Sequence, residues 1–309
     1  MPSARMERLL LSLDGLSVGD AYGASGGRMG FGARWTDDTA MAACLANVLL
    51  RCGHVDMDAL AAELVTCFGS NPNRGYGPNL MRVLADILAG VPWQQAAVAP
   101  THGQRTWLDH LRRWLGLAPR NAGGSCGNGA AARVAPLGAF FSGADLPLVA
   151  KQASRSAMVT HAHPEGVAGA VAVALAASVV QGHGGLGAVG LAQLAGLVPG
   201  REVRDGLLHA CELLLNGADA MQAAAQLGNG MPILAQQTVP FAMWCAAKHM
   251  DNYPLALETA LSAGGDSDTI CAMVGGIVAM NVGRNGIPSK WLSRREPLPP
   301  LHANEAILL

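Results

Sequence analysis

Alanine- and leucine-rich segments of about 10 to 17 residues run through the whole chain, separated by glycine and proline. Their apolar residues recur at helical spacing, and the alternating pattern of a half-buried strand is almost absent. Alanine and leucine are among the strongest helix formers. Half of the 309 residues are apolar, and a chain of this length can bury a large core. The sequence therefore predicts an all-α protein whose helices pack in a compact bundle.

We expect helices wherever this periodicity is clear. They are Arg5–Tyr22, Thr39–Arg51, Met57–Phe68, Asn79–Ala89, Arg105–Leu115, Ala130–Phe140, Leu146–Val159, Glu165–Val180, Leu186–Leu197, Val203–Leu215, Asp219–Leu227, Thr238–His249, Pro254–Ala263 and Thr269–Val282. No internal repeat of constant period and no low-complexity linker divides them. The simplest organisation is one domain over residues 1–309, with a core at about 9–292 and a C-terminal tail at 293–309.

The charge and hydropathy patterns argue against two classes of partner. The net charge is −1 with no basic block, whereas nucleic-acid binding requires clustered positive charge. The one tight basic group, Arg294–Arg295 beside Glu296, is expected to lie in a solvated tail. The longest apolar stretch, residues 166–180, has 15 residues, and a membrane span needs roughly 20. We therefore expect a buried helix there, no nucleic acid and no membrane.

Cysteine usage predicts the compartment. The seven cysteines are odd in number, scattered and never spaced C-x-x-C, unlike a disulfide framework or a zinc site. The N-terminal segment 1–13 carries Arg5, Glu7 and Arg8 among its apolar residues, so it lacks the uninterrupted apolar region of a signal peptide. We expect a monomer in the reducing cytoplasm.

Two acid-rich segments, Thr36–Asp38 and Asp266–Thr269, stand immediately before apolar helices. Each alone is explained by helix capping, because Asp, Ser and Thr side chains accept hydrogen bonds from the free amides of a first turn. Together they hold four carboxylates, which is more acid than two caps use. If the segments meet in space, a cation must offset their repulsion, and such oxygen donors suit Mg²⁺, Mn²⁺ or Ca²⁺.

A glycine-rich run over residues 123–129 precedes an alanine-rich helix. Glycine permits close approach of the backbone to a ligand, and free amides at a helix start attract a phosphate. The spacing fits neither a P-loop nor a Rossmann turn, so those nucleotide folds are not supported. Taken by itself, the run is more typical of an ordinary loop than of a phosphate-binding site.

The segment Thr160–Gly166 contains two histidines and a glutamate. A metal or acid–base site is one interpretation. We favour a helix boundary, in which His161 is a cation at the end of one helix while Pro164 and Glu165 begin the next. The H-x-H spacing lacks further Cys or His ligands for zinc.

Six segments follow one another along the chain in a distinctive order. They are Gly19–Gly23, Thr36–Met41, Arg74–Pro78, Gly124–Pro136, Thr160–Gly166 and Gly265–Ile270. This series resembles the signature motifs of the ADP-ribosylglycohydrolases, the family that includes the dinitrogenase-reductase-activating glycohydrolase. The ending Gly283–Pro288, with Trp291, also resembles the family's closing pattern. The resemblance covers about residues 9–292, and six motifs in order are far more specific than any one of them.

The resemblance implies an orthogonal all-α fold with two divalent cations, Mg²⁺ or Mn²⁺, in a cleft. By motif position the metal ligands are Thr36, Asp37 and Asp38 from one side and Asp266, Asp268 and Thr269 from the other. Asp37, Asp38 and Asp268 are the catalytic candidates, with Asp37 or Asp38 polarising a water that the two metals activate. The residues implied to contact ADP-ribose are Gly75, Tyr76, Gly77, Gly124, Ser125, Cys126, Gly127, Asn128, Gly129 and His161.

Such an enzyme releases ADP-ribose from a modified protein side chain, or from a small ADP-ribose conjugate. Many relatives carry a glutamate four residues after the first motif, implicated in the branch that acts on serine-linked ADP-ribose. Gly27 occupies that position here, and no glutamate lies between Glu7 and Glu63. This favours the N-glycosidic arginine linkage over an O-linked (serine or acyl) one. A protein that binds ADP-ribose with weak or lost catalysis, and a scaffold whose aspartates only cap helices, remain alternatives.

Overall fold

The computed structural model describes residues 3–99, 123–180 and 186–304, and these ranges contain helices and no strand. The helices are α1 (Ala4–Ala24), α2 (Asp37–Cys52), α3 (Met57–Ser70), α4 (Pro78–Leu88), α5 (Trp93–Val98), α7 (Gly129–Ala132), α8 (Ala135–Phe140), α9 (Leu146–Met158), α10 (Pro164–Val179), α11 (Ala188–Ala195), α12 (Arg201–Leu215), α13 (Ala220–Leu227), the short 3₁₀ turn η1 (Ala235–Gln237), α14 (Val239–Lys248), α15 (Tyr253–Ser262), α16 (Ser267–Gly286) and α17 (Ser289–Arg294). The all-α prediction is confirmed.

One predicted helix differs from the structure, one lies outside the described residues, and two short helices were not predicted. The helix predicted at Ala130–Phe140 is wrong as one element, because it divides into α7 and α8. Pro136 has no N–H to donate to the carbonyl of Ala132, and its ring crowds that carbonyl, so α7 ends there. The six-residue helices α5 and α17 were not predicted, since they are too short to show a period. The helix predicted at Arg105–Leu115 lies outside the described residues.

Helices α1 and α16 pack against each other in opposite directions at unusually short distance. Gly15, Gly19 and Gly23 recur every four residues along one face of α1. A Cβ added to them would lie 2.4 Å from the Gly275 carbonyl oxygen, 2.1 Å from that of Cys271 and 2.4 Å from that of Ser267, respectively. Each α1 glycine therefore touches the α16 backbone itself. This contact brings the C-terminal end of α1 to the start of α16.

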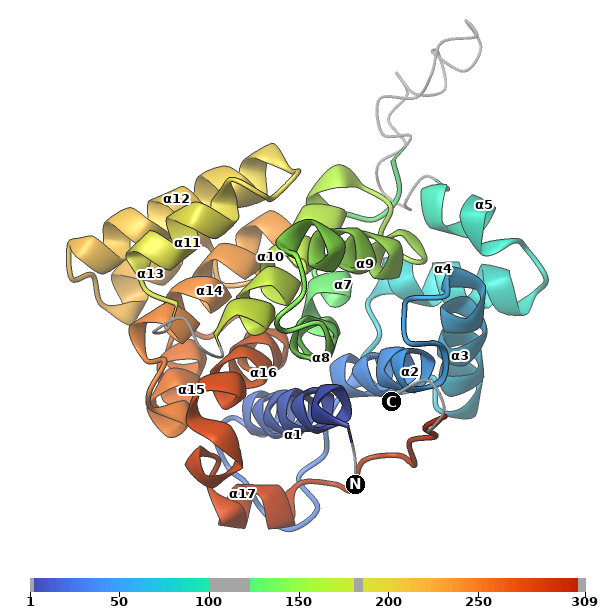
Figure 1. The fold of residues 1–309 in the computed structure, drawn as a ribbon, viewed down its shortest axis with the longest axis horizontal. Helices are drawn as coiled ribbons and strands as arrows, with labels where there is room; N and C mark the ends of the chain where they lie inside the picture. The colour runs from blue at the N-terminus through green and yellow to red at the C-terminus, as the bar shows by residue number, and fades with distance from the viewer. Residues whose placement is uncertain (1–2, 100–122, 181–185, 305–309) are drawn as a thin grey trace, which may run out of the picture.

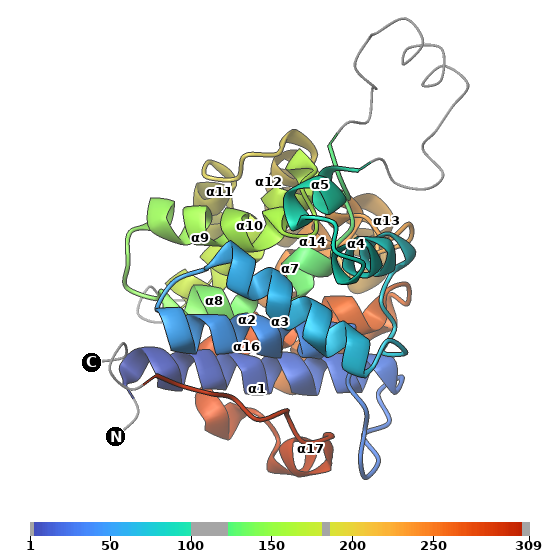
Figure 2. The same cartoon turned by 90° about the vertical axis from the view of Figure 1, so that its right-hand side faces the viewer.

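The other helices are arranged around this pair. In Figure 1, α2 to α5 lie on one side of α1 and α16, and α11 to α13 lie on the opposite side. Figure 2 shows α17 beneath α1, on the face away from most of the bundle. Helix α10 is buried along most of its length, as expected for a helix that is apolar on all sides. The buried helix predicted for the longest apolar stretch is thus confirmed.

The solvated environment expected for Arg294–Arg295 and Glu296 is wrong. The backbone at Arg295 bridges that of Ala33. The Arg295 side chain, 10% exposed, donates to Asp14, and Glu296 pairs with Arg74. The segment after α17 therefore packs on the start of the chain.

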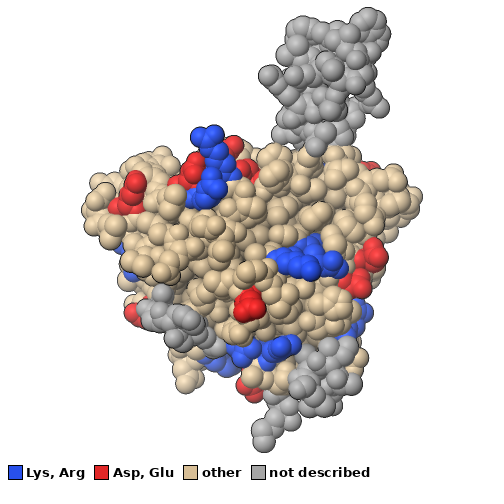
Figure 3. Space-filling view, turned by 45° about the horizontal axis from the view of Figure 1, so that its top comes forward, with Lys and Arg blue, Asp and Glu red and all other residues tan. Residues whose placement is uncertain are grey.

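Two further observations concern surface charge and helix length. The face in Figure 3 shows separated charged groups and no continuous basic surface. Within the described ranges, no helix combines the length and apolarity needed to cross a membrane.

The glycine contact between α1 and α16 makes a stability prediction. We expect Gly19→Ala to lower the free energy of unfolding by about 1–3 kcal/mol, because the added Cβ meets backbone that no rotamer change can move. Gly69→Ala is the matched control, since Gly69 is exposed in α3 and an added Cβ meets nothing within 4 Å. Urea unfolding followed by circular dichroism measures both. Equal stability of the two variants would contradict the close packing.

Candidate functional site

Asp20, near the C-terminal end of α1, organises the start of α2. Its fully buried carboxylate accepts hydrogen bonds from the backbone N–H of Thr36 (3.0 and 2.9 Å) and of Thr39 (3.0 Å), and from the Thr39 hydroxyl. Thr36 caps α2, because its Oγ1 accepts from the Asp38 N–H. The capping function expected for Thr36 is confirmed, and a neighbouring helix holds the cap in place.

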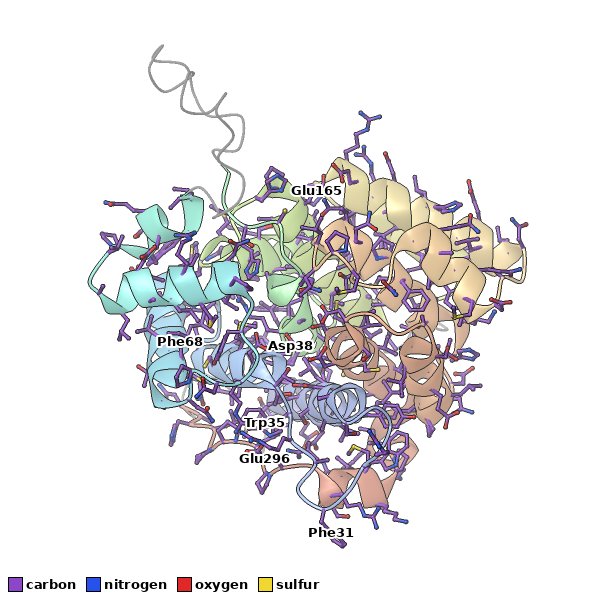
Figure 4. The ribbon with its side chains drawn as sticks, turned by 180° about the vertical axis from the view of Figure 1, so that it is seen from behind. Phe31, Trp35, Asp38, Phe68, Glu165 and Glu296 are labelled. Carbon is purple, nitrogen blue, oxygen red and sulfur yellow. The ribbon has the colours of Figure 1, made fainter. Side chains whose placement is uncertain are left out.

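The two acid-rich segments meet at one cleft. Its lining comprises Asp37, Asp38, Gly75, Gly77, Pro78, Asn79, Leu80, Ser125, Gly127, Asn128, Gly129, His161, Ile233, Asp266, Asp268 and Thr269. Figure 4 shows Asp38 near the middle of the molecule, where α2, α7 and α16 approach one another. Segments about 230 residues apart in the sequence thus contribute acids to the same cavity.

The carboxylates around this cleft lack cationic partners. Within the described ranges, no Lys, Arg or His forms an ion pair with Asp20, Asp37, Asp38, Asp266 or Asp268. Burial is the main cause that raises the pKa of Asp20 to about 7, of Asp37 to about 8 and of Asp266 to about 7. Repulsion from neighbouring carboxylates adds to it. Burial likewise raises the pKa of Asp38 well above its ordinary value.

The donor set fits a hard divalent cation. Asp38 Oδ2 is buried and has no hydrogen-bond partner, and an unsatisfied buried carboxylate oxygen is costly unless a ligand occupies it. As the side chains stand, no three His, Cys, Asp or Glu residues in the described part of the chain converge closely enough to hold a metal alone. Threonine hydroxyls or water would complete the shell, which suits Mg²⁺ because it retains several waters.

The glycine-rich segment lines the same cleft beside the acids. Asn128 Nδ2 donates to Asp266 Oδ2 (2.6 Å) and to Thr238 Oγ1 (3.1 Å), so this loop is fastened to the start of α16. Helix α7, which follows, has only four residues. A substantial helix dipole is therefore absent. The Gly127 N–H donates to Ser125 Oγ (3.2 Å) within the loop.

His161 lies in the cleft wall, and its predicted charge is wrong. Burial, with a smaller contribution from Arg133, lowers the pKa of His161 to about 3, so the ring is neutral. The helix boundary itself is confirmed, because α10 begins at Pro164 with His163 as its cap. Glu165 turns away from the cleft and accepts from the N–H groups of Glu202 and Val203.

Four of the predicted site residues do not line the cleft. The Thr36 side chain caps α2, and Tyr76 is buried against Phe68, with ring centroids 5.2 Å apart. Gly124 packs on Ala97 and Ala162, and the Cys126 carbonyl accepts from the Ala235 N–H. The remaining predicted residues line the cleft.

Several residues that build or line the cleft were not singled out from the sequence. Asp20 could have been, because a carboxylate amid the apolar residues of α1 requires partners. Arg74 is a second, since its carbonyl accepts from the Asp37 N–H (2.9 Å) while its guanidinium pairs with Glu296 at 2.6 Å. Figure 4 shows Trp35 and Glu296 side by side below the cleft. Asn79 and Ile233 carried no sequence signal, since only the tertiary fold places them there.

A comparison with known families decides the identity. The model of the ADP-ribosylglycohydrolase family matches residues 1–306. The chain belongs to the ADP-ribosylglycohydrolase family. The family, the all-α fold and the enzyme class predicted from the sequence are therefore confirmed.

Individual relatives agree with this glycohydrolase assignment. The chain is 30% identical to human ADP-ribosylhydrolase ARH3 over 286 residues, covering 83% of this chain and 73% of that protein. It is 26% identical to the ADP-ribosylarginine hydrolase Tri1 of Serratia proteamaculans, covering 92% of this chain and 69% of that protein. An ADP-ribosylglycohydrolase-related protein complex of known structure shares the fold, with a TM-score of 0.56, 23% identity, and 99% and 95% of the two chains covered.

The raised carboxylate pKa values predict how stability of this glycohydrolase depends on pH. An acid whose pKa is raised by folding contributes stability that is present below its unfolded pKa, near 4, and lost as the pH rises through the folded value. In chelator, we expect the free energy of unfolding of the wild type to fall more steeply than that of Asp38→Asn between about pH 5 and 8.5. Urea unfolding across this range measures both slopes. Parallel slopes would contradict the repulsion among these acids.

Proposed function

We propose that this protein hydrolyses the N-glycosidic bond between ADP-ribose and a modified arginine side chain, using two divalent cations, Mg²⁺ or Mn²⁺. The observation that carries the proposal is the cleft itself. Both acid pairs, the Ser125–Gly129 loop and His161 line one cavity. The family contributes the reaction class, since the named relatives are ADP-ribosylhydrolases.

The residues divide into two groups by chemistry. The metals would be held by the residues that line the cleft from the two acid-rich segments, which are Asp37, Asp38, Asp266, Asp268 and Thr269. Thr36, the cap of α2, precedes the first of them. When bound, such a pair orients the ribose hydroxyls and lowers the pKa of a coordinated water. Asp37 or Asp38 polarises the attacking water, and the surrounding carboxylates stabilise the positive charge that develops at the anomeric carbon. The Ser125–Gly129 loop binds the phosphates and the ribose.

The arginine preference rests on the sequence, which has Gly27 where many relatives carry a glutamate, and the structure shows that glycine suits this position. Gly27 has φ +81°, and a Cβ there would lie 3.0 Å from Leu261 Cδ2 and 3.3 Å from the Tyr22 hydroxyl. A side chain at this position would be strained and would meet those groups. Gly27 is also absent from the cleft lining. The likeness to a hydrolase named for ADP-ribosylarginine agrees with this preference.

Charge-removing substitutions test the catalytic assignment. Asp38→Asn and Asp268→Asn should each lower turnover of ADP-ribosylarginine protein by at least about 100-fold, as expected for loss of one preorganised electrostatic group, while the helical circular dichroism is unchanged. Asp145→Asn is the matched control, because Asp145 is an exposed cap of α9 that makes no side-chain cap hydrogen bond. Wild-type turnover by Asp38→Asn would remove the proposed mechanism.

The linkage is tested by substrate comparison. ADP-ribose release should occur from arginine-modified protein with Mg²⁺, stop with chelator, and be much slower from serine-modified protein. Release from the serine linkage at an equal or higher rate would overturn the linkage assignment. Binding of ADP-ribose without release from either substrate would identify a binding protein with lost catalysis.

Metal and ligand binding are measurable without turnover. Mg²⁺ and ADP-ribose together should raise the melting temperature, since a ligand at 100 times its dissociation constant stabilises the native state by about 2.7 kcal/mol. The Mg²⁺ effect should increase as the pH rises from about 6 to 8.5, because binding requires the deprotonated carboxylates. No shift with either ligand would leave the aspartates as helix caps alone.

A further inference from the structure

Arg133 is a fully buried cation without a carboxylate partner in the described ranges. It follows α7 directly and is held by neutral acceptors. Its guanidinium donates to the Ser156 carbonyl oxygen (2.5 Å), the Ser156 hydroxyl (3.4 Å) and Thr160 Oγ1 (2.9 Å). Burying an unpaired charge is costly, so this arrangement needs a reason beyond packing.

Thr160 connects Arg133 to the cleft. Thr160 is fully buried, and its Oγ1 lies 2.8 Å from His161 Nδ1. A guanidinium can only donate, so Thr160 Oγ1 must accept from Arg133. Within the described residues, the one remaining partner of the Thr160 hydroxyl is His161 Nδ1. A hydroxyl oxygen can accept two hydrogen bonds, but if Nδ1–H also donated to it, the buried hydroxyl proton would have no acceptor, which is costly. The hydroxyl proton therefore points to Nδ1, and Nδ1 accepts it.

The acceptor role of Nδ1 determines whether the other ring nitrogen, Nε2, carries a proton. A neutral imidazole has one donor and one acceptor nitrogen, so its proton lies on Nε2. His161 Nε2 is 3.4 Å from the positions that Cβ atoms on Gly127 and Gly129 would occupy, so it faces the glycine-rich wall of the cleft. The buried guanidinium also opposes a second proton on the ring.

We propose that Arg133 and Thr160 are positioning residues that hold His161 as a neutral Nε2–H donor directed into the cleft. The group it recognises is an oxygen that accepts a hydrogen bond, either a phosphate oxygen or a ribose hydroxyl oxygen of the bound nucleotide. His161 is then a fixed hydrogen-bond donor and takes no part in proton transfer at neutral pH. The identity of the acceptor rests on the proposed function, whereas the ring tautomer does not.

The tautomer is measured directly on the full-length protein without ligand. In two-bond ¹H–¹⁵N correlation spectra, His161 should show an unprotonated Nδ1 and a protonated Nε2, unchanged between about pH 5 and 8. The His161→Asn variant assigns its signals among the nine histidines. An Nδ1–H tautomer, or titration of His161 within this range, would overturn the proposal whatever the enzymatic activity.

Two substitutions of Thr160 separate the hydroxyl from its packing. Thr160→Val keeps the shape but removes the hydroxyl, so the ring should gain the Nδ1–H tautomer, and the dissociation constant of ADP-ribose with Mg²⁺ should rise roughly ten-fold. Thr160→Ser keeps the hydroxyl and should restore the wild-type tautomer and affinity to within about two-fold. We call the chain of hydrogen bonds from Arg133 through Thr160 to His161 the relay. A wild-type tautomer in Thr160→Val would contradict the relay.

Failure of the relay and failure of the proposed function give different results. The expected tautomer in a protein that neither binds nor releases ADP-ribose would reject the proposed ligand and support the relay. Normal turnover with an Nδ1–H tautomer would reject the relay and support the function. Uridine diphosphate with Mg²⁺, which offers phosphates without the distal ribose, distinguishes the acceptors. If Thr160→Val binds uridine diphosphate more weakly than the wild type does, the acceptor of the His161 hydrogen bond is a phosphate oxygen. If the two proteins bind it equally, the acceptor is a hydroxyl of the distal ribose.

Discussion

The close contact of α1 with α16 is the constraint on which the site depends. Three glycines spaced by four residues let the α1 backbone touch the α16 backbone. Asp20 is one residue past Gly19, and Asp268 is beside Gly23, so this contact places the acids of two distant segments around one point. A larger residue at Gly19 or Gly23 would separate the helices and, with them, the two halves of the site.

The acids stand together at a cost that the surrounding structure offsets only in part. Asp20 is satisfied by the amides of Thr36 and Thr39, whereas Asp38 Oδ2 has no partner. The unsatisfied buried carboxylate is the observation behind the proposed cation site. The segment before α2, which carries Trp35 and Thr36, is also held by Arg74. The Arg74 guanidinium lies 3.7 Å from the centroid of the Trp35 ring and pairs with Glu296. The C-terminal segment thereby supports the segment that carries Asp37 and Asp38.

The glycine-rich side of the cleft is organised by neutral hydrogen bonds around a buried charge. Arg133 acts through Thr160 on His161, and Asn128 ties the glycine-rich loop to Asp266. The cleft thus combines the acids with the glycine-rich loop and His161. This combination suits a ligand that carries both hydroxyls and phosphates, which links the proposed substrate to the way the cleft is built.

The sequence by itself determined the helical class, the family and most of the cleft, because helical periodicity and ordered motifs are local properties of the chain. The sequence identified Asp37, Asp38, Asp266 and Asp268 as one set of metal ligands only through the family resemblance. Either segment taken alone is explained as a helix cap. Tertiary structure decided the rest. It showed that Tyr76 belongs to the core, that His161 is neutral, and that Asp20 holds the acid loop. These properties depend on burial and on partners far along the chain, and only the folded protein brings those together.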